Sequence, residues 1–212
     1  MKPYLILTVL ALSTGLAPLR AVPVAAFDFT GGSRVGTLGV TLGFDFDVHS
    51  TVQVTHLGLF DSNDNGLSSS HLVGLWSDTG TLLSQVTIPS GTTAPSDDSF
   101  RYVALTTPLV LTAGKYVVGA QVGNFETYVQ HATAVNLTGL LSYGTSRAYT
   151  DAIAFAFPYQ VNPFGDDAGY FGPNLKVEAV ATGVPDGGGL PLVAIALLGL
   201  VGAGRRWRRQ AV

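Results

Sequence analysis

Hydrophobic and polar residues alternate with a period of two along much of residues 27–183, a pattern typical of half-buried β-strands. In Phe44-Asp45-Phe46-Asp47-Val48 the alternation is strict. The three apolar side chains are therefore expected to face a core, and both carboxylates are expected to face outward. Nine further stretches have strand character: 51–60, 71–76, 81–88, 100–111, 115–122, 128–135, 140–149, 152–159 and 175–181.

Clusters of Gly, Pro, Asn, Asp and Ser separate these stretches, and no convincing amphipathic helix occurs between them. Short strands at a spacing of roughly 8–12 residues are typical of sandwiches and jelly rolls. The sequence therefore predicts one all-β domain over residues 27–183, a single β-sandwich of jelly-roll-like kind.

Residues 1–26 have the composition of a secretory signal peptide. Lys2 supplies a positive start, an apolar stretch follows at 4–12, and Val24-Ala25-Ala26 places small residues before Phe27. We therefore expect export and cleavage before Phe27. The alternatives are a first core strand or an uncleaved anchor.

The other end of the chain, residues 184–212, carries three elements in order. Val184-Pro185-Asp186-Gly187 comes first, then the uncharged apolar stretch 190–204, and then a basic cluster made of Arg205, Arg206, Arg208 and Arg209. The apolar stretch would span ~22 Å as a helix, and the preceding glycines can extend it toward the ~30 Å of a hydrocarbon core. The sequence predicts one short transmembrane helix with the arginines in the cytoplasm and the β-domain outside. An ordinary tail anchor after a Gly/Pro linker is the alternative.

This tripartite C-terminus resembles the PEP-CTERM sorting signals, and its Val-Pro-Asp-Gly motif is most similar to their VPDSG variant. Gly188 stands where that variant has serine. The resemblance implies recognition and cleavage by exosortase, a membrane enzyme of Gram-negative bacteria, many of which also make exopolysaccharide. It implies that the precursor is held in the inner membrane. The processed protein would then reach the cell surface, the outer envelope or the extracellular matrix.

The body of the chain also resembles a known family. The segments 54–61, 66–76, 80–83, 100–103, 111–116 and 170–175 are similar to a domain of unknown function that recurs in PEP-CTERM proteins. The resemblance spans about residues 35–180. It implies an all-β fold and brings no activity with it.

Charge narrows the choice of partners. Residues 27–183 hold five Lys and Arg against 13 Asp and Glu, a formal charge of −8, although the whole chain carries −3. An acidic body repels phosphate backbones, so nucleic acid is not an expected partner. The chain has no cysteine, which removes thiol catalysis and thiolate metal sites.

One loop has the beginning of a calcium-binding motif. Asp61, Asn63 and Asn65 stand at positions 1, 3 and 5 of such a loop, with Gly66 at position 6. Position 12 is Leu72, where a bidentate glutamate is expected. The sequence therefore leaves two interpretations: a Ca²⁺ site, or a hairpin loop that ends in the favoured turn pair Asn65-Gly66.

Aromatic residues concentrate late in the chain. Exposed rings could stack on sugars, whereas alternation such as Phe155-Ala156-Phe157 also fits one buried strand face. The candidate rings are Tyr143, Tyr149, Phe155, Phe157, Tyr159, Phe164, Tyr170 and Phe171.

No residue set points to a catalytic reaction, and none is assigned as catalytic. The carboxylate pairs are Asp45/Asp47, Asp97/Asp98 and Asp166/Asp167. Neighbouring carboxylates do not establish the cleft that glycoside hydrolysis needs. The four histidines lack zinc-site spacing, and no nucleophile elbow or P-loop is present. We expect a non-catalytic surface or matrix protein without a cofactor. The alternatives are a carbohydrate-binding module for the host exopolysaccharide and, third, a secreted hydrolase.

Overall fold

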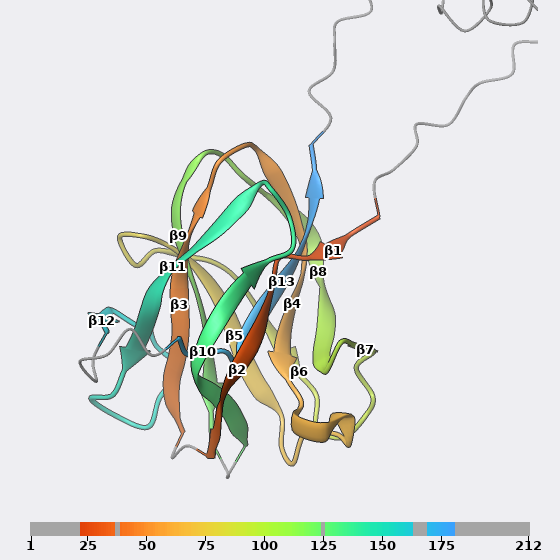
Figure 1. Cartoon of the computed structure of the whole chain (residues 1–212), viewed down its shortest axis with the longest axis vertical. Helices are drawn as coiled ribbons and strands as arrows, with labels where there is room; N and C mark the ends of the chain where they lie inside the picture. The colour runs from red at the N-terminus through yellow and green to blue at the C-terminus, as the bar shows by residue number, and fades with distance from the viewer. Residues whose placement is uncertain (1–21, 37–38, 124–125, 163–168, 181–212) are drawn as a thin grey trace, which may run out of the picture. The chain divides into compact units, whose positions relative to one another are not determined.

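The β-strands of this chain occupy most of residues 22–36, 39–123, 126–162 and 169–180, which are the residues that the computed structural model describes (Figure 1). One short 3₁₀ helix, η1 (Ser62–Asp64), lies among them. The strands are β1 (Val24–Ala25), β2 (Phe27–Gly36), β3 (Val40–Val48), β4 (Val52–Phe60), β5 (His71–Ser77), β6 (Leu82–Ile88), β7 (Ser96–Asp97), β8 (Phe100–Leu111), β9 (Gly114–Val122), β10 (Thr127–Asn136), β11 (Leu141–Tyr149), β12 (Gln160–Val161) and β13 (Pro173–Ala179).

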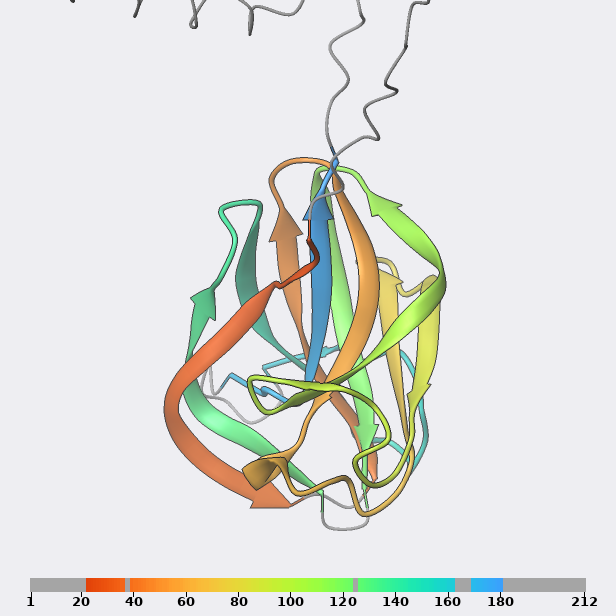
Figure 2. The ribbon, with the colours of Figure 1, turned by 90° about the vertical axis from the view of Figure 1, so that its right-hand side faces the viewer.

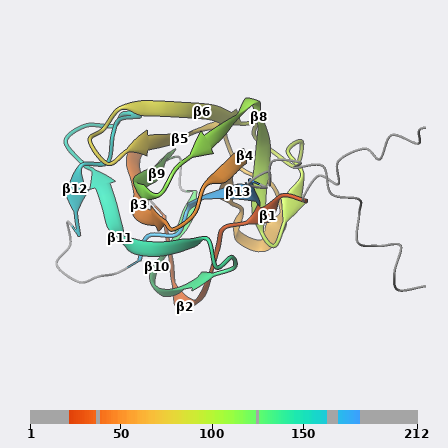
Figure 3. The same cartoon turned by 90° about the horizontal axis from the view of Figure 1, so that it is seen from above.

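These strands form two large antiparallel sheets and a two-stranded ribbon. The order in the five-stranded sheet is β1-β13-β4-β8-β7, and the order in the six-stranded sheet is β12-β11-β3-β9-β5-β6. The ribbon pairs β2 with β10 and lies along one side of the large sheets (Figure 2). Seen from above, β5, β9 and β3 face β8, β4 and β13 (Figure 3). The all-β prediction is confirmed, and the arrangement is sandwich-like.

The core lies between the large sheets and joins their inward faces. Phe44 and Phe46 of β3 and Leu57 and Leu59 of β4 are at most 1% exposed. The ribbon closes one side of this core, because the ring of Phe27 on β2 meets the ring of Phe44 edge-on at 5.2 Å. The predicted inward alternation of β3 is therefore confirmed.

Most of the predicted strands exist, and the differences have local causes. The predictions 71–76, 100–111 and 140–149 match β5, β8 and β11 to within one residue. The first strand of the ribbon, β2, was missed because Gly31-Gly32 interrupts its alternation. Both glycines have positive φ angles, of 72° and 83°, within the strand.

The strand predicted at 152–159 is wrong. This segment is irregular and packs on the outer face of the six-stranded sheet. The Thr41 hydroxyl donates to the Ala154 carbonyl at 2.7 Å and accepts from the Ala156 amide at 3.1 Å. These two hydrogen bonds satisfy backbone groups of the segment that a neighbouring strand would otherwise pair. The ring of Phe155 packs on Trp76, with 5.3 Å between the ring centroids.

A row of glycines makes room for this segment. Gly43, Gly119 and Gly74 are paired across β3, β9 and β5. A methyl group on Gly74 would overlap the rings of Trp76 and Phe155, and one on Gly119 would press on Pro158 at 3.1 Å. The missing side chains thus let an irregular segment bury aromatic surface against a sheet.

The end of the expected signal peptide lies partly in the folded unit, while residues 1–21 are outside the described residues. Val24 and Ala25 of β1 pair with Val177 and Lys176 of β13. Ala26 is fully buried, donates its amide to Leu175 at 2.9 Å and accepts from the Leu137 amide at 3.0 Å. Cleavage before Phe27 would remove these contacts.

The predicted membrane segment 190–204 lies outside the described residues. Among the residues that the structure does describe, no helix has the length and apolar character needed to cross a membrane.

The glycine row gives a direct test of the packing. Gly74→Ala is expected to lower the free energy of unfolding by about 1–3 kcal/mol, because the methyl group overpacks the Trp76–Phe155 contact. Gly139→Ala is the matched control, since its methyl group would enter open space. Urea unfolding measures both variants, and equal losses would contradict the packing described.

Candidate functional site

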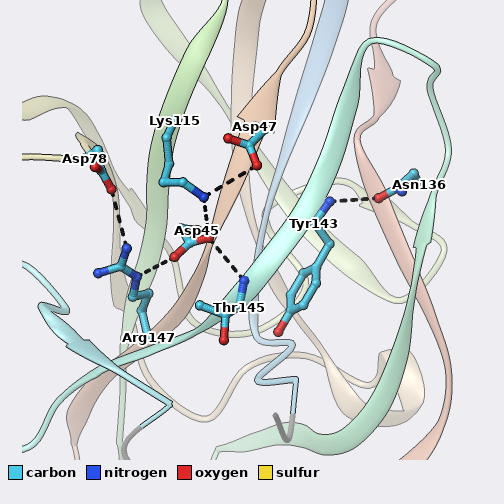
Figure 4. Close-up of polar contacts among 8 residues, drawn as sticks. All are labelled: Asp45, Asp47, Asp78, Lys115, Asn136, Tyr143, Thr145 and Arg147. Atoms are coloured by element: carbon cyan, nitrogen blue, oxygen red, sulfur yellow. Dashed lines mark hydrogen bonds and ion pairs between the residues drawn. The ribbon is translucent and has the colours of Figure 1, made fainter.

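The largest charged cluster described lies on the outer face of the six-stranded sheet and centres on Asp45 (Figure 4). The Asp45 side chain is 2% exposed, although its position on β3 points away from the core. Arg147 of β11 donates from Nε to Asp45 Oδ2 at 2.6 Å. Lys115 of β9 donates to Asp45 Oδ1 at 3.3 Å. Asp45 therefore faces outward as predicted, but its neighbours cover it.

A bulge in β11 completes the site of Asp45. The register of β11 against β3 shifts between Tyr143 and Ser146. Within this bulge the Thr145 amide donates to Asp45 Oδ1 at 3.1 Å. Gly144 is required there, because a side-chain carbon would collide with the Asp45 carboxylate. The two Asp45 oxygens thus accept from an arginine, a lysine and a backbone amide.

The rim of this cluster is open to water. Asp47 is 44% exposed and accepts from Lys115 at 3.4 Å, and Asp78 is 49% exposed and accepts from Arg147 at 3.4 Å. Burial lowers the pKa of Lys115, but the charges of Asp45 and Asp47 and their hydrogen bonds outweigh it, so its pKa lies above the usual value. The lysine stays charged at neutral pH, and the arrangement acts as a structural ion-pair network.

A second network occupies the predicted calcium loop. Asp61 is 1% exposed, and its Oδ2 accepts from Arg101 Nε at 2.7 Å and from the Gly66 amide at 2.9 Å. Arg101 also donates to Asp64 Oδ1 at 2.7 Å. The Asn63 amide oxygen accepts from Arg34 at 2.7 Å. Two of the three predicted oxygen ligands therefore bind guanidinium groups here.

The Ca²⁺ site at Asp61, Asn63 and Asn65 stays a prediction, and bound Ca²⁺ would have to displace Arg101 and Arg34 from these oxygens. Within the described residues, no three His, Asp or Glu side chains gather closely enough to hold a metal ion. A rise of the melting temperature in millimolar Ca²⁺ is what the calcium hypothesis predicts.

The hairpin interpretation of the same loop is wrong. The loop joins β4 of the five-stranded sheet to β5 of the six-stranded sheet, so its flanking strands do not pair. The positive φ angles fall at Asn63 and Asp64 as well as Gly66, and Asn65 has a φ of −102°. A connection between sheets therefore replaces the expected type I′ turn.

The predicted aromatic cluster separates into buried and exposed members. Tyr170 and Phe171 are at most 1% exposed, so neither can stack on a sugar in this fold. Tyr143 packs on Phe171 at 5.3 Å, and Phe155 and Phe157 lie against Trp76. Phe164 is outside the described residues.

Tyr149 and Tyr159 remain as an accessible pair. Their rings meet edge-on at 6.1 Å, and Tyr159 is 49% exposed. The Tyr159 hydroxyl donates to Asp151 at 2.7 Å, and the Gln160 amide donates to the same carboxylate at 3.2 Å. The hydrogen bond to Asp151 raises the pKa of Tyr159, so its hydroxyl stays protonated at neutral pH.

The remaining predicted residues are spread over the fold. Asp97 and Asp98 lie at the β7–β8 turn of the five-stranded sheet, away from the strand that carries Asp45 and Asp47. Asp166 and Asp167 fall outside the described residues, as do the sorting motif Val184, Pro185, Asp186 and Gly187 and the arginines 205, 206, 208 and 209.

Comparison with family models gives one match, over residues 30–162, to a family described as a domain of unknown function, DUF4082. The chain belongs to the DUF4082 family. The match covers β3–β12 and therefore both ion-pair networks of the domain. No curated protein matches the chain.

The sequence did not predict Arg147, Lys115 and Arg101 of this DUF4082 domain as members of a site. Their signal was present, because they are three of only five cations in residues 27–183, and Arg101 and Lys115 lie in largely apolar strands. A charged residue in such a strand is expected to have a partner when the strand is buried.

The two carboxylates of β3 can be told apart by unfolding. Asp45→Asn is expected to lower the free energy of unfolding by about 3 kcal/mol, because it leaves Arg147 without its buried counter-charge. Asp47→Asn is expected to cost less than about 1 kcal/mol, because Asp47 is half exposed. Urea unfolding near neutral pH measures both, and similar losses would show that Asp45 is not the centre of the network.

Proposed function

We propose that this chain is an exported surface or matrix protein whose non-catalytic β-domain is delivered by a C-terminal sorting signal. The observation that carries the proposal is the order of the three elements at residues 184–209: the Val-Pro-Asp-Gly motif, the apolar stretch and the arginine cluster. In this proposal Val184, Pro185, Asp186 and Gly187 are recognised by an exosortase-like enzyme. The apolar stretch 190–204 holds the precursor in the inner membrane.

The arginine cluster sets the topology of that precursor. Arg205, Arg206, Arg208 and Arg209 stay in the cytoplasm under the positive-inside rule, so the DUF4082 domain is exported. Processing then releases the domain to the cell surface or the extracellular matrix.

The electrostatics of the domain are consistent with this role. Four of its five cations form ion pairs with carboxylates: Arg101, Lys115, Arg147 and Lys176. The acidic surplus thus faces solvent, which favours a soluble module that repels other acidic surfaces.

The sorting proposal is tested in the native host by intact mass and membrane fractionation. The wild-type protein is expected to lack the residues after about Asp186. The double variant Pro185→Ala/Asp186→Ala is expected to keep them and to stay in the inner membrane. The same masses report whether the mature chain begins at Phe27 or keeps β1.

Substitutions at Gly188 and Gly189 are the matched control, because they change the linker but leave the motif intact. If wild type and double variant keep the arginine cluster and fractionate alike, the tail is a plain anchor and the sorting proposal fails.

A second candidate function is carbohydrate binding, and the Tyr149–Tyr159 pair favours it. An exposed tyrosine ring beside a carboxylate and an amide offers sugar both an apolar face and hydrogen-bonding groups. In this proposal Asp151 and Gln160 fix the orientation of a sugar on the Tyr159 ring, and the host exopolysaccharide is the ligand.

Retention of the purified protein on the host exopolysaccharide tests this second candidate. Tyr159→Ala is expected to weaken retention roughly three- to tenfold, the loss of one aromatic contact. Val161→Ala is the control, because Val161 is 55% exposed near the same edge and offers no ring. No retention of the wild type, or equal retention of both variants, would exclude binding at this site.

A further inference from the structure

A small hollow opens beside the β7–β8 turn, between the five-stranded sheet and β2 of the ribbon. It lies next to the Asp61 network, because the Ser99 carbonyl of this turn accepts from the Asp61 amide at 2.8 Å. Its volume is about 240 Å³, below the ~300–1,000 Å³ of sites for drug-sized ligands. Its walls are apolar at Phe27, Phe100 and Leu137 and acidic at Asp28 and Asp98. The hollow therefore has room for a short molecule with both apolar and cationic character.

A buried phenol lines this hollow. Tyr102 of β8 is 3% exposed, and its hydroxyl has no hydrogen-bond partner among the described residues. Its ring lies across Gly58 of β4, where any side chain would collide with it. A buried hydroxyl without a partner costs about 1–3 kcal/mol, so a donor or acceptor supplied by a bound molecule would relieve this cost.

The surroundings keep this phenol protonated. Burial raises the pKa of Tyr102 far above its usual value, and the charges of Asp97, Asp98 and Asp28 raise it further. Tyr102 lines the same hollow as these carboxylates. A neutral phenol beside carboxylates can accept a hydrogen bond from a cationic donor.

The carboxylates at the hollow are not neutralised by the protein. Within the described ranges, Asp28 and Asp98 form no ion pair, whereas Asp97 pairs with Lys176 at 2.6 Å. That lysine lies over the Tyr102 ring, 4.5 Å from its centroid, and balances Asp97. The hollow therefore keeps a net charge of two negative units from Asp28 and Asp98.

The backbone holds Asp98 in place at some cost. Asp98 and Ser99 both have positive φ angles, 52° and 65°, in the two-residue turn between β7 and β8. Such turns favour Asn-Gly or Asp-Gly, and serine fits this conformation poorly. The turn presents the Asp98 carboxylate toward the hollow without covering it.

A metal ion does not suit this acidic wall. The carboxylates do not gather closely enough to count as a metal site in the described part of the chain. The apolar walls would also leave much of a metal ion's coordination shell unfilled. A diamine spreads its two charges over a hydrocarbon chain, which suits a hollow lined by two unpaired carboxylates and by apolar side chains.

We propose that this hollow binds a short aliphatic diamine, with one ammonium group at Asp28, the other at Asp98, and a hydrogen bond from one of them to the Tyr102 hydroxyl. The site goes beyond the sorting and sugar-binding proposals and depends on neither. Its polar residues all follow Phe27, but Pro23, Val24 and Ala25 also line the hollow, so the site as described belongs to a chain that keeps β1.

The test is a titration of the purified ¹⁵N-labelled protein with putrescine, followed through the amide resonances of Asp98 and Ser99. Putrescine is expected to give a saturable shift, and 1,4-butanediol, which matches it in size without charge, is expected to give none. The absence of a putrescine shift, or an equal shift with butanediol, would overturn the proposal.

Two variants locate the binding, and a third serves as the control. Tyr102→Phe and Asp98→Asn are each expected to weaken putrescine binding about tenfold or more, since the first removes a hydrogen bond to a charged group and the second removes a counter-charge. Asp47→Asn on the other sheet is expected to bind as wild type. Equal affinity of all four proteins would overturn the assignment.

Thermal unfolding separates a binding role of Tyr102 from a structural one. Tyr102→Phe removes only the unpartnered hydroxyl, so its melting temperature is expected to equal or exceed that of wild type. A destabilised Tyr102→Phe protein with unchanged putrescine affinity would mean that the hydroxyl serves the fold. Asp98 lies on an exposed turn, so Asp98→Asn is expected to fold. Its putrescine affinity still tests the proposal if Tyr102→Phe folds poorly.

Discussion

The apolar faces of the five-stranded and six-stranded sheets are buried against each other, and this contact positions the charged and aromatic groups of the domain. Because side chains alternate along a strand, burying one face of β3 directs Asp45 to the other face. The outer face of the six-stranded sheet is covered by an irregular segment and by charged side chains. The glycine row accepts the 152–158 segment, and Arg147 and Lys115 cover Asp45. Much of that sheet is thus protected from water on both faces.

The small number of cations determines which carboxylates of the domain form ion pairs. Five Lys and Arg serve 13 carboxylates between residues 27 and 183, and the most buried carboxylates described, Asp45 and Asp61, both bind arginine. This distribution follows the cost of desolvation, which is largest for a buried charge without a partner. The carboxylates that stay unpaired, such as Asp28 and Asp98, lie where water reaches them. The acidic surface and the acidic hollow therefore have the same cause: the few cations pair with the buried carboxylates and leave some exposed ones unpaired.

The sequence predicted β3, β5, β8 and β11 because their alternation is strong and their boundaries are marked by turn residues. It failed at 152–159, where Phe155-Ala156-Phe157 alternates like a strand but has no strand beside it to bond. Local pattern records which side chains are apolar, whereas strand pairing depends on distant segments. The same limit applies to the Asp61 loop, where Arg101, 40 residues away, binds the carboxylate that resembled a calcium ligand.

The sequence by itself determined the all-β class, the inward alternation of Phe44, Phe46 and Val48, and the acidic character of the domain, since these follow from residue types and their spacing. The sequence also provides the whole basis for the sorting proposal, because a sorting signal of this kind is defined by the order of its residues and not by a folded surface. Only the tertiary structure decided which carboxylates are neutralised and that the Tyr102 hydroxyl is buried without a partner. Those features depend on contacts between strands far apart in the chain, and residue order alone does not specify them.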